Sequence, residues 1–185
     1  MNTLRCLRHL ALLLATLLTV ACADDVQDYY AHERAFFRFT PVTAAMPLYT
    51  AVNSAGEWCK VTFAPGLYTF TSAHGLTATY PATALEAYGQ PEYVAGFVVG
   101  TPSVPGIDGL HEVAAFDLVC PACYEQNMVQ RSLAFTDHEL LTCPRCQRVY
   151  DLQNGGLQRE GEPGPKMYRY HVNYSSATQS LLIIN

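Results

Sequence analysis

Two Cys-x-x-Cys pairs are the residues of this 185-residue chain whose type and spacing best support chemistry. The pairs are Cys120/Cys123 and Cys143/Cys146, and residues 124–142 separate them. Pro follows the first Cys of each pair, which favours a tight turn with both thiolates facing one centre and backbone N–H groups facing the sulfurs. Four such ligands suit one tetrahedral zinc ion or an iron centre. The pattern predicts a metal site, and two disulfides are the alternative.

The segment after the second pair limits which protein families the chain can resemble. Strand-like residues 147–152, a glycine turn at 155–156, a Gly/Pro loop at 161–165 and residues 167–170 follow in that order, and strand-like residues 113–119 precede the first pair. Over about residues 93–185 this order resembles the second half of a Rieske iron–sulfur domain. The resemblance implies an all-β, Rieske-like antiparallel sandwich or barrel. Its small metal-binding subdomain, about residues 118–165, is expected to consist of two Cys-x-x-Cys hairpin tips.

The ligands depart from the Rieske pattern, in which one ligand of each turn is His. Cys123 and Cys146 stand at those positions here. All-cysteine clusters have potentials of roughly −400 mV, against about −150 to +300 mV where two His are ligands. Quinol oxidation is therefore not expected. We expect a non-enzymatic protein with one structural four-cysteine centre that holds zinc or mononuclear iron. The alternative is a [2Fe–2S] or rubredoxin-like electron-transfer protein of the cell envelope.

The first 21 residues read as a targeting segment. Arg5 and Arg8 precede an apolar run, residues 10–20, that is too short to remain as a membrane-spanning helix. The run ends in Leu-Thr-Val-Ala-Cys, which resembles the lipobox of bacterial lipoproteins with Cys22 as the lipidated residue. We expect a signal peptide at 1–21, a polar tether at 22–33 and a β domain at 34–185. Ordinary signal cleavage near Ala21 or Ala23 is the alternative.

This interpretation predicts a lipid-anchored protein in the cell envelope of a Gram-negative bacterium, at the outer membrane. Without residues 1–21 the chain loses Arg5 and Arg8, which leaves nine Lys/Arg against 16 Asp/Glu and a net charge of −7. That charge argues against nucleic acid or an anionic membrane surface as a partner. The membrane, through the N-terminal lipid, is the one partner that the sequence predicts. No phosphate loop, serine-nucleophile motif or catalytic carboxylate pair suggests an enzyme.

The rest of the chain must position the two cysteine turns, and its pattern is mostly β. One short helix or turn is expected at 81–88. Short strands are expected at 35–43, 48–52, 93–100, 110–119 and 128–135, and hairpins at 58–63 with 66–71 and at 168–174 with 179–184.

Single cysteine and histidine residues have simpler interpretations. Cys59 lies in a strand-like run and is expected to be a buried, inert thiol. The histidines are scattered along the chain with no pair at ligand spacing, and His111 and His138 are expected at the surface.

Overall fold

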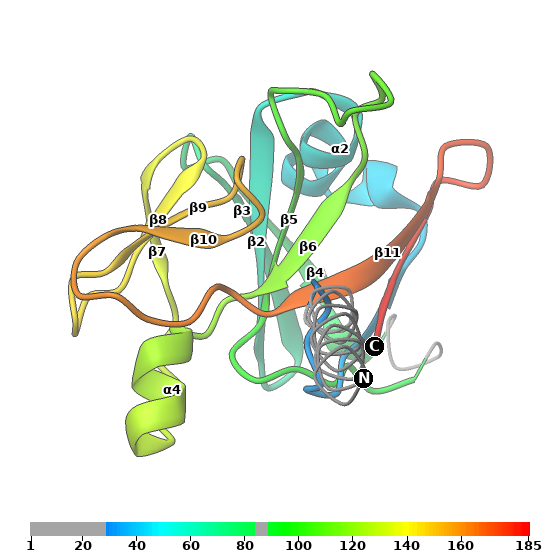
Figure 1. The fold of residues 1–185 in the computed structure, drawn as a ribbon. Helices are drawn as coiled ribbons and strands as arrows, with labels where there is room; N and C mark the ends of the chain where they lie inside the picture. Colours follow the sequence, from blue (N-terminus) through cyan, green and yellow to red (C-terminus); the bar gives the residue numbers. More distant parts are fainter. Residues whose placement is uncertain (1–28, 84–88) are drawn as a thin grey trace, which may run out of the picture. The chain divides into compact units, whose positions relative to one another are not determined.

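Two antiparallel sheets account for the twelve strands in the computed structural model, which describes residues 29–83 and 89–185. The larger sheet has the order β1-β12-β11-β6-β5-β2-β3-β4, and the smaller has the order β10-β9-β8-β7. Figure 1 shows both, and they confirm the predicted all-β class. The strands are β1 (Phe36–Phe39), β2 (Glu57–Ala64), β3 (Leu67–Ser72), β4 (Thr77–Pro81), β5 (Phe97–Thr101), β6 (Ala114–Asp117), β7 (Ala134–Asp137), β8 (Leu140–Thr142), β9 (Val149–Asp151), β10 (Leu157–Glu160), β11 (Arg169–Ser175) and β12 (Ser180–Ile184).

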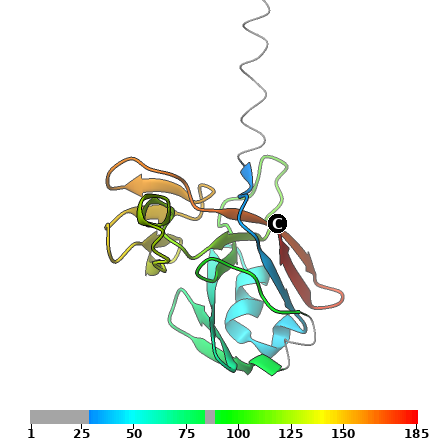
Figure 2. The same cartoon turned by 90° about the horizontal axis from the view of Figure 1, so that it is seen from below.

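Two predicted hairpins are confirmed in the larger sheet. Strands β2 and β3 pair up to Ala64↔Leu67, around the Pro65-Gly66 turn, and β11 pairs with β12. The larger sheet curls, as Figure 2 shows from below. Its two edge strands approach each other through Phe39 of β1 and Tyr80 of β4, whose ring centroids are 5.2 Å apart.

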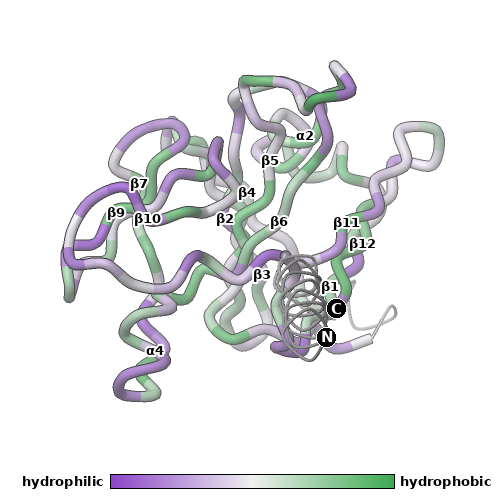
Figure 3. The backbone as a smooth tube through the Cα atoms, in the orientation of Figure 1, coloured by the Kyte–Doolittle hydropathy of each residue, from purple (hydrophilic) through white to green (hydrophobic). Residues whose placement is uncertain are grey.

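Strands β5 and β6 are buried on both faces, as is β2 at Trp58 and Cys59. Successive residues of a strand point to opposite faces, and here both directions lead into apolar packing. One core, inside the curl, includes Cys59, Val61, Phe97, Val99 and Ala115. The other core, towards the smaller sheet, includes Trp58, Val98, Ala114, Phe116 and Leu118. Every residue of β5 and β6 is therefore buried, and hydrophobic residues dominate these two strands in Figure 3.

The prediction of a strand at 48–52 is wrong, because helix α2 (Met46–Asn53) occupies these residues. Leu48, Ala51 and Val52 are buried at the i, i+3, i+4 spacing of a helix face and pack near β2 and β5. Pro47 lies in the first turn, where no N–H is needed. The hydroxyl of Thr101 in β5 donates a 2.8 Å hydrogen bond to the Ala51 carbonyl, which fixes the helix to the sheet. A short 3-10 helix, η2 (Val42–Ala44), precedes it.

The first cysteine pair opens helix α4 (Pro121–Asn127), so the prediction of a hairpin tip there is corrected. Pro121 directly after Cys120 suits the first turn of a helix, since it lacks an N–H that would need a partner. The helix ends at Met128, which has a left-handed backbone with φ 54°. The predicted strand at 128–135 is also wrong over most of its length, because β7 begins at residue 134. An isolated bridge, Val119↔Ser132, closes the loop around the helix.

Several predictions lie wholly or partly outside the described residues. The signal peptide, Cys22 and most of the tether fall within residues 1–28, and most of the helix or turn expected at 81–88 falls within 84–88. Residues 31–185 form one unit. In the part of the chain that the structure describes, no helix has the length and apolar character needed to cross a membrane.

A buried carboxylate, Asp117, ends β6 three residues before Cys120. It is fully buried and accepts hydrogen bonds from the N–H groups of Val94, Ala95 and Val119 at 2.7–3.0 Å. The Tyr170 hydroxyl of β11 donates a fourth, at 3.2 Å. Burial raises the pKa of Asp117, and these hydrogen bonds oppose that shift. The Asp117 carboxylate thus holds three segments together: the residues before β5, strand β11 and the residues that lead to Cys120.

Replacing Asp117 by Ala should destabilise the domain strongly. The change leaves one buried and two part-buried N–H groups without their acceptor, and we expect the free energy of unfolding to fall by about 3 kcal/mol. Asp117→Asn, which keeps one acceptor oxygen, should lower the free energy of unfolding by less. Urea unfolding followed by circular dichroism measures both.

Asp108→Ala is the matched control, because the Asp108 carboxylate accepts a hydrogen bond from the Leu110 N–H in an exposed loop. It should change stability by less than about 1 kcal/mol. Equal effects at positions 108 and 117 would contradict the role assigned to Asp117.

Candidate metal centre

The first half of the site is the start of α4. Cys120 is the residue before the helix, and its carbonyl accepts the Tyr124 N–H at 3.0 Å. The Cys120 N–H in turn donates to the Arg131 carbonyl at 2.8 Å, so the returning chain holds the turn. Cys123 lies in the first turn of the helix, on the same side as Cys120. A hydrogen bond from the Cys123 backbone to the Cys120 sulfur accompanies this geometry, as the sequence predicted.

The second half of the site is the tip of the β8–β9 hairpin, as predicted. Cys143 follows β8, and its N–H donates to the Arg148 carbonyl at 3.0 Å. The Gln147 N–H donates back to the Cys143 carbonyl at 3.0 Å. Gln147 adopts a left-handed backbone with φ 60°, which reverses the chain so that Cys146 points at the first pair. This turn is therefore tight, with two short hydrogen bonds across it.

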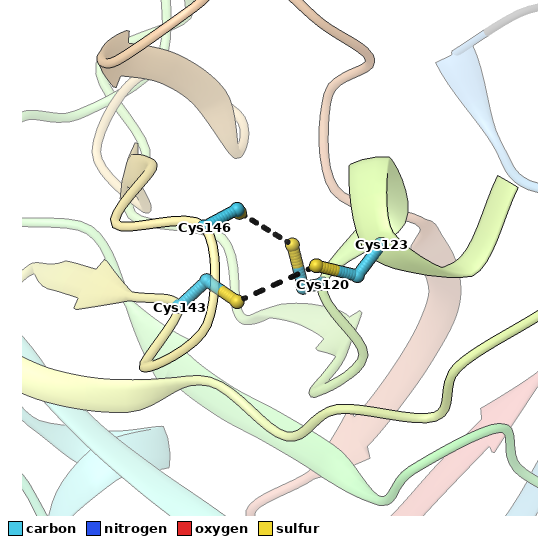
Figure 4. A group of neighbouring side chains, drawn as sticks. All are labelled: Cys120, Cys123, Cys143 and Cys146. Carbon is cyan, nitrogen blue, oxygen red and sulfur yellow. Dashed lines mark hydrogen bonds between the residues drawn. The ribbon is translucent and has the colours of Figure 1, made fainter. Parts of the chain in front are cut away.

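All four sulfur atoms converge. Every Sγ lies within 4.8 Å of the other three, and the cross-turn contacts are 3.6 Å for Cys120–Cys146 and 3.8 Å for Cys123–Cys143 (Figure 4). Sulfurs bound tetrahedrally at about 2.3 Å to one zinc ion lie roughly 3.8 Å apart. A disulfide bond is only about 2.05 Å long, and all five cysteines in the described part of the chain are free. The sulfurs therefore have the spacing of ligands to one metal ion.

The site is mostly closed off from solvent. Cys120, Cys123 and Cys143 are buried, and only Cys146 is partly exposed. Their surroundings are the apolar side chains of the second core, such as Phe116, Leu118, Leu133, Leu141 and Met167. Burial raises the pKa of Cys120 and of Cys123, because a lone thiolate is poorly solvated there. A bound cation would offset that cost and hold the sulfurs as thiolates.

Two neighbouring side chains complete the environment of the sulfurs. The buried Tyr150 hydroxyl lies 3.6 Å from Cys120 Sγ. Burial raises the pKa of Tyr150, so its hydroxyl keeps the proton that it shares with the sulfur. Arg148, which is 5% exposed, forms hydrogen bonds to Cys146. Partial burial raises the pKa of Cys146, but hydrogen bonds from the Arg148 backbone and side chain, together with those from Cys143 and Cys120, outweigh it and lower the pKa to about 6.

Residues 161–165 hold the Arg148 side chain in place. The guanidinium Nε donates to the Glu162 carbonyl at 2.8 Å, and a terminal nitrogen lies 3.4 Å from the Glu162 carboxylate. Gly161 has φ +100°, and a Cβ there would lie 3.0 Å from Arg148 Cγ. A Cβ on Gly164 would touch both Arg148 Nε and Ala122. The loop thus packs across Arg148 onto the first cysteine turn.

The other residues singled out in the sequence lie away from the sulfurs. Cys59 is fully buried in the first core, as predicted, and burial raises its pKa. His111 and His138 are exposed, as predicted. Sequence reasoning missed the roles of Arg148 and Tyr150, although both closely follow Cys146: Arg148 directly precedes β9, and Tyr150 lies within it. It also missed that His74 lies against His138, with ring centroids 4.3 Å apart, since no local spacing signals that contact.

No protein-family model matches the chain, and no curated protein shows significant similarity to it.

The contact between Arg148 and Cys146 predicts a specific pH dependence in the metal-free protein. The thiolate is the form that alkylates, so the rate at Cys146 should rise with pH and reach half its maximum near pH 6. Arg148→Met removes the side-chain hydrogen bond and the positive charge, so the midpoint should move to higher pH. Iodoacetamide labelling, followed by peptide mass spectrometry, gives the rate at each pH.

Arg145→Met is the control, because Arg145 is an exposed residue of the same turn. It should leave the midpoint unchanged. A midpoint that stays in place in the Arg148 variant would show that the side chain does not act on Cys146.

Proposed function

We propose that this protein is a membrane-anchored lipoprotein whose Rieske-like β domain holds one zinc or mononuclear iron ion in a structural four-cysteine centre. The observation that carries the proposal is the convergence of the four sulfurs of Cys120, Cys123, Cys143 and Cys146 to within 4.8 Å. The position of the Cys143/Cys146 turn on a small four-stranded sheet beside a larger β base supports the Rieske-like part of the proposal. The lipobox-like segment ending at Cys22 supports the anchor.

A structural role follows from the ligand set. Four protein ligands fill a tetrahedral site and leave no position for a substrate or a reactive water. The ion would join the start of α4 to the β8–β9 hairpin, two segments that belong to different parts of the small subdomain. It would also convert raised-pKa thiols into thiolates inside an apolar core, which is favourable only while the ion is bound.

Electron transfer is the second candidate, and the contacts of the sulfurs favour it. Hydrogen bonds to thiolate sulfurs and solvent exposure tune the potential of an iron centre. Here the Tyr150 hydroxyl lies beside Cys120, and Arg148 lies beside the partly exposed Cys146. An iron ion in this site would have a route for electrons at the Cys146 edge. Zinc has no redox role, so the identity of the metal separates the two functions.

Metal analysis of the full-length protein, purified anaerobically, tests the centre. We expect about one equivalent of zinc or iron per chain. Cys146→Ser should remove most of the metal, because it deletes one of four ligands. The fold should survive in large part, since a domain of this size has its own core. Elemental analysis, visible absorption and circular dichroism give the three readouts.

Cys59→Ala is the matched control, as it removes a buried thiol outside the site. It should leave the metal content unchanged. The centre would be disproved if no zinc or iron copurified and the four thiols were found in disulfide bonds.

The anchor has its own test. Cys22→Ser removes the thiol that a lipid would modify, so the protein should lose lipid labelling and leave the membrane fraction, or accumulate unprocessed. Metabolic labelling with a radioactive fatty acid and membrane fractionation measure this. Full labelling of the variant would refute lipidation at Cys22 and leave the metal proposal untouched.

A further inference from the structure

Two histidines from different sheets lie against each other outside the cysteine centre. His74 is in the turn between β3 and β4 of the larger sheet, and His138 is in the turn between β7 and β8 of the smaller sheet. Their ring centroids are 4.3 Å apart, and each side chain is about half exposed, at 50% and 56%. Two imidazole rings whose centroids are this close can each turn a nitrogen towards one shared cation, and both rings are open to solvent for its entry.

Both turns are held at Trp58, so the meeting of the two rings is fixed by the fold. On the His74 side, the Ala73 N–H donates to the Trp58 carbonyl at 3.0 Å. On the His138 side, the Glu139 carboxylate accepts from the Trp58 indole at 3.5 Å. The same carboxylate accepts from the Ser103 N–H at 3.0 Å and from the Ser103 hydroxyl at 2.9 Å. These contacts place the β7–β8 turn on the larger sheet.

A carboxylate also orients one of the rings. His74 Nε2 lies 3.1 Å from Glu57 Oε1, and the Glu57 side chain is only 26% exposed. An ionised carboxylate only accepts hydrogen bonds, so the pairing assigns the hydrogen to Nε2 and leaves the lone pair on Nδ1. A carboxylate that fixes the tautomer of a histidine in this way is the usual support of a metal-binding imidazole.

We propose that His74 and His138 together bind a divalent transition-metal cation, with Glu57 orienting His74. Imidazole suits nickel, zinc and copper. When two imidazole rings bind one ion, a nitrogen of each ring lies about 2.0–2.1 Å from it, and the ring centroids are then roughly 5 Å apart. The observed centroid separation of 4.3 Å is close to this value. In the described part of the chain only the four cysteines gather three or more ligand atoms, so water completes the coordination here. The ion clamps the two sheets together, and the site is independent of the cysteine centre.

Nickel titration of the full-length protein, purified without a histidine tag, tests the site. Ni²⁺ is the probe, and Trp58, the single tryptophan, lies beside both turns and reports binding by fluorescence quenching. We expect saturable quenching with one equivalent bound. His74→Ala and His138→Ala should each weaken binding at least about tenfold, and Glu57→Ala should weaken it less. His111→Ala, at an exposed histidine on another loop, should change nothing.

The titration has clear negative outcomes. Equal Ni²⁺ affinity in the wild type and in the His74/His138 double variant would overturn the proposal, as would no binding to the wild type up to about 1 mM Ni²⁺. If an alanine variant fails to fold, His74→Gln and His138→Gln keep the size and polarity of the side chains and replace it. Zinc or iron content measured on the same samples reports the cysteine centre separately, so failure of one site is distinguished from failure of the other.

Discussion

Four sulfur atoms packed inside an apolar core are the constraint on which the arrangement of the two sheets depends. Trp58 and Phe116 of the larger sheet and Leu141 of the smaller sheet line the same core as Cys120 and Cys143. Burial raises the pKa of Cys120 and of Cys123, whereas a bound cation would hold all four sulfurs as thiolates. Binding or loss of an ion would therefore change the charge of a core that both sheets share. Such an ion would act on the packing between the sheets as well as on the closure of two turns.

The positions of the cysteines follow from strand alternation in the larger sheet. Ala115 faces the core inside the curl, whereas Phe116 and Leu118 face the core that contains the sulfurs. Asp117, between them, satisfies the N–H groups of the chain entering β5 and of the chain approaching Cys120. A shift of one residue along β6 would exchange the two faces and break these bonds. The register of β6 thus determines the position of the first cysteine turn.

Local patterns predicted the parts of the fold that local forces decide. Alternation and a Pro-Gly turn identified the β2–β3 hairpin, and the paired Cys-Pro-x-Cys turns identified the four cysteines whose sulfurs converge. Helix α2 was misread because Leu48, Ala51 and Val52 are too short a run to separate a period of 3.6 from a period of 2. The partners of Asp117, and the meeting of His74 with His138, join residues far apart in the chain. Such contacts depend on how the sheets pack, which single-sequence periodicity does not encode.

The charges around the sulfurs are distributed unevenly, and this distinguishes one edge of the centre from the rest. A divalent ion with four thiolates has a net charge of −2, and Arg148 is the cation next to it, on the Cys146 side. The Arg148 guanidinium donates a hydrogen bond to the backbone carbonyl of Glu162, and the side-chain carboxylate of Glu162 is exposed. Cys146 is also the partly exposed ligand, whereas the three buried ligands face apolar side chains. If a metal is bound there, a chelator, an oxidant or an electron-transfer partner would therefore reach the centre first at Cys146.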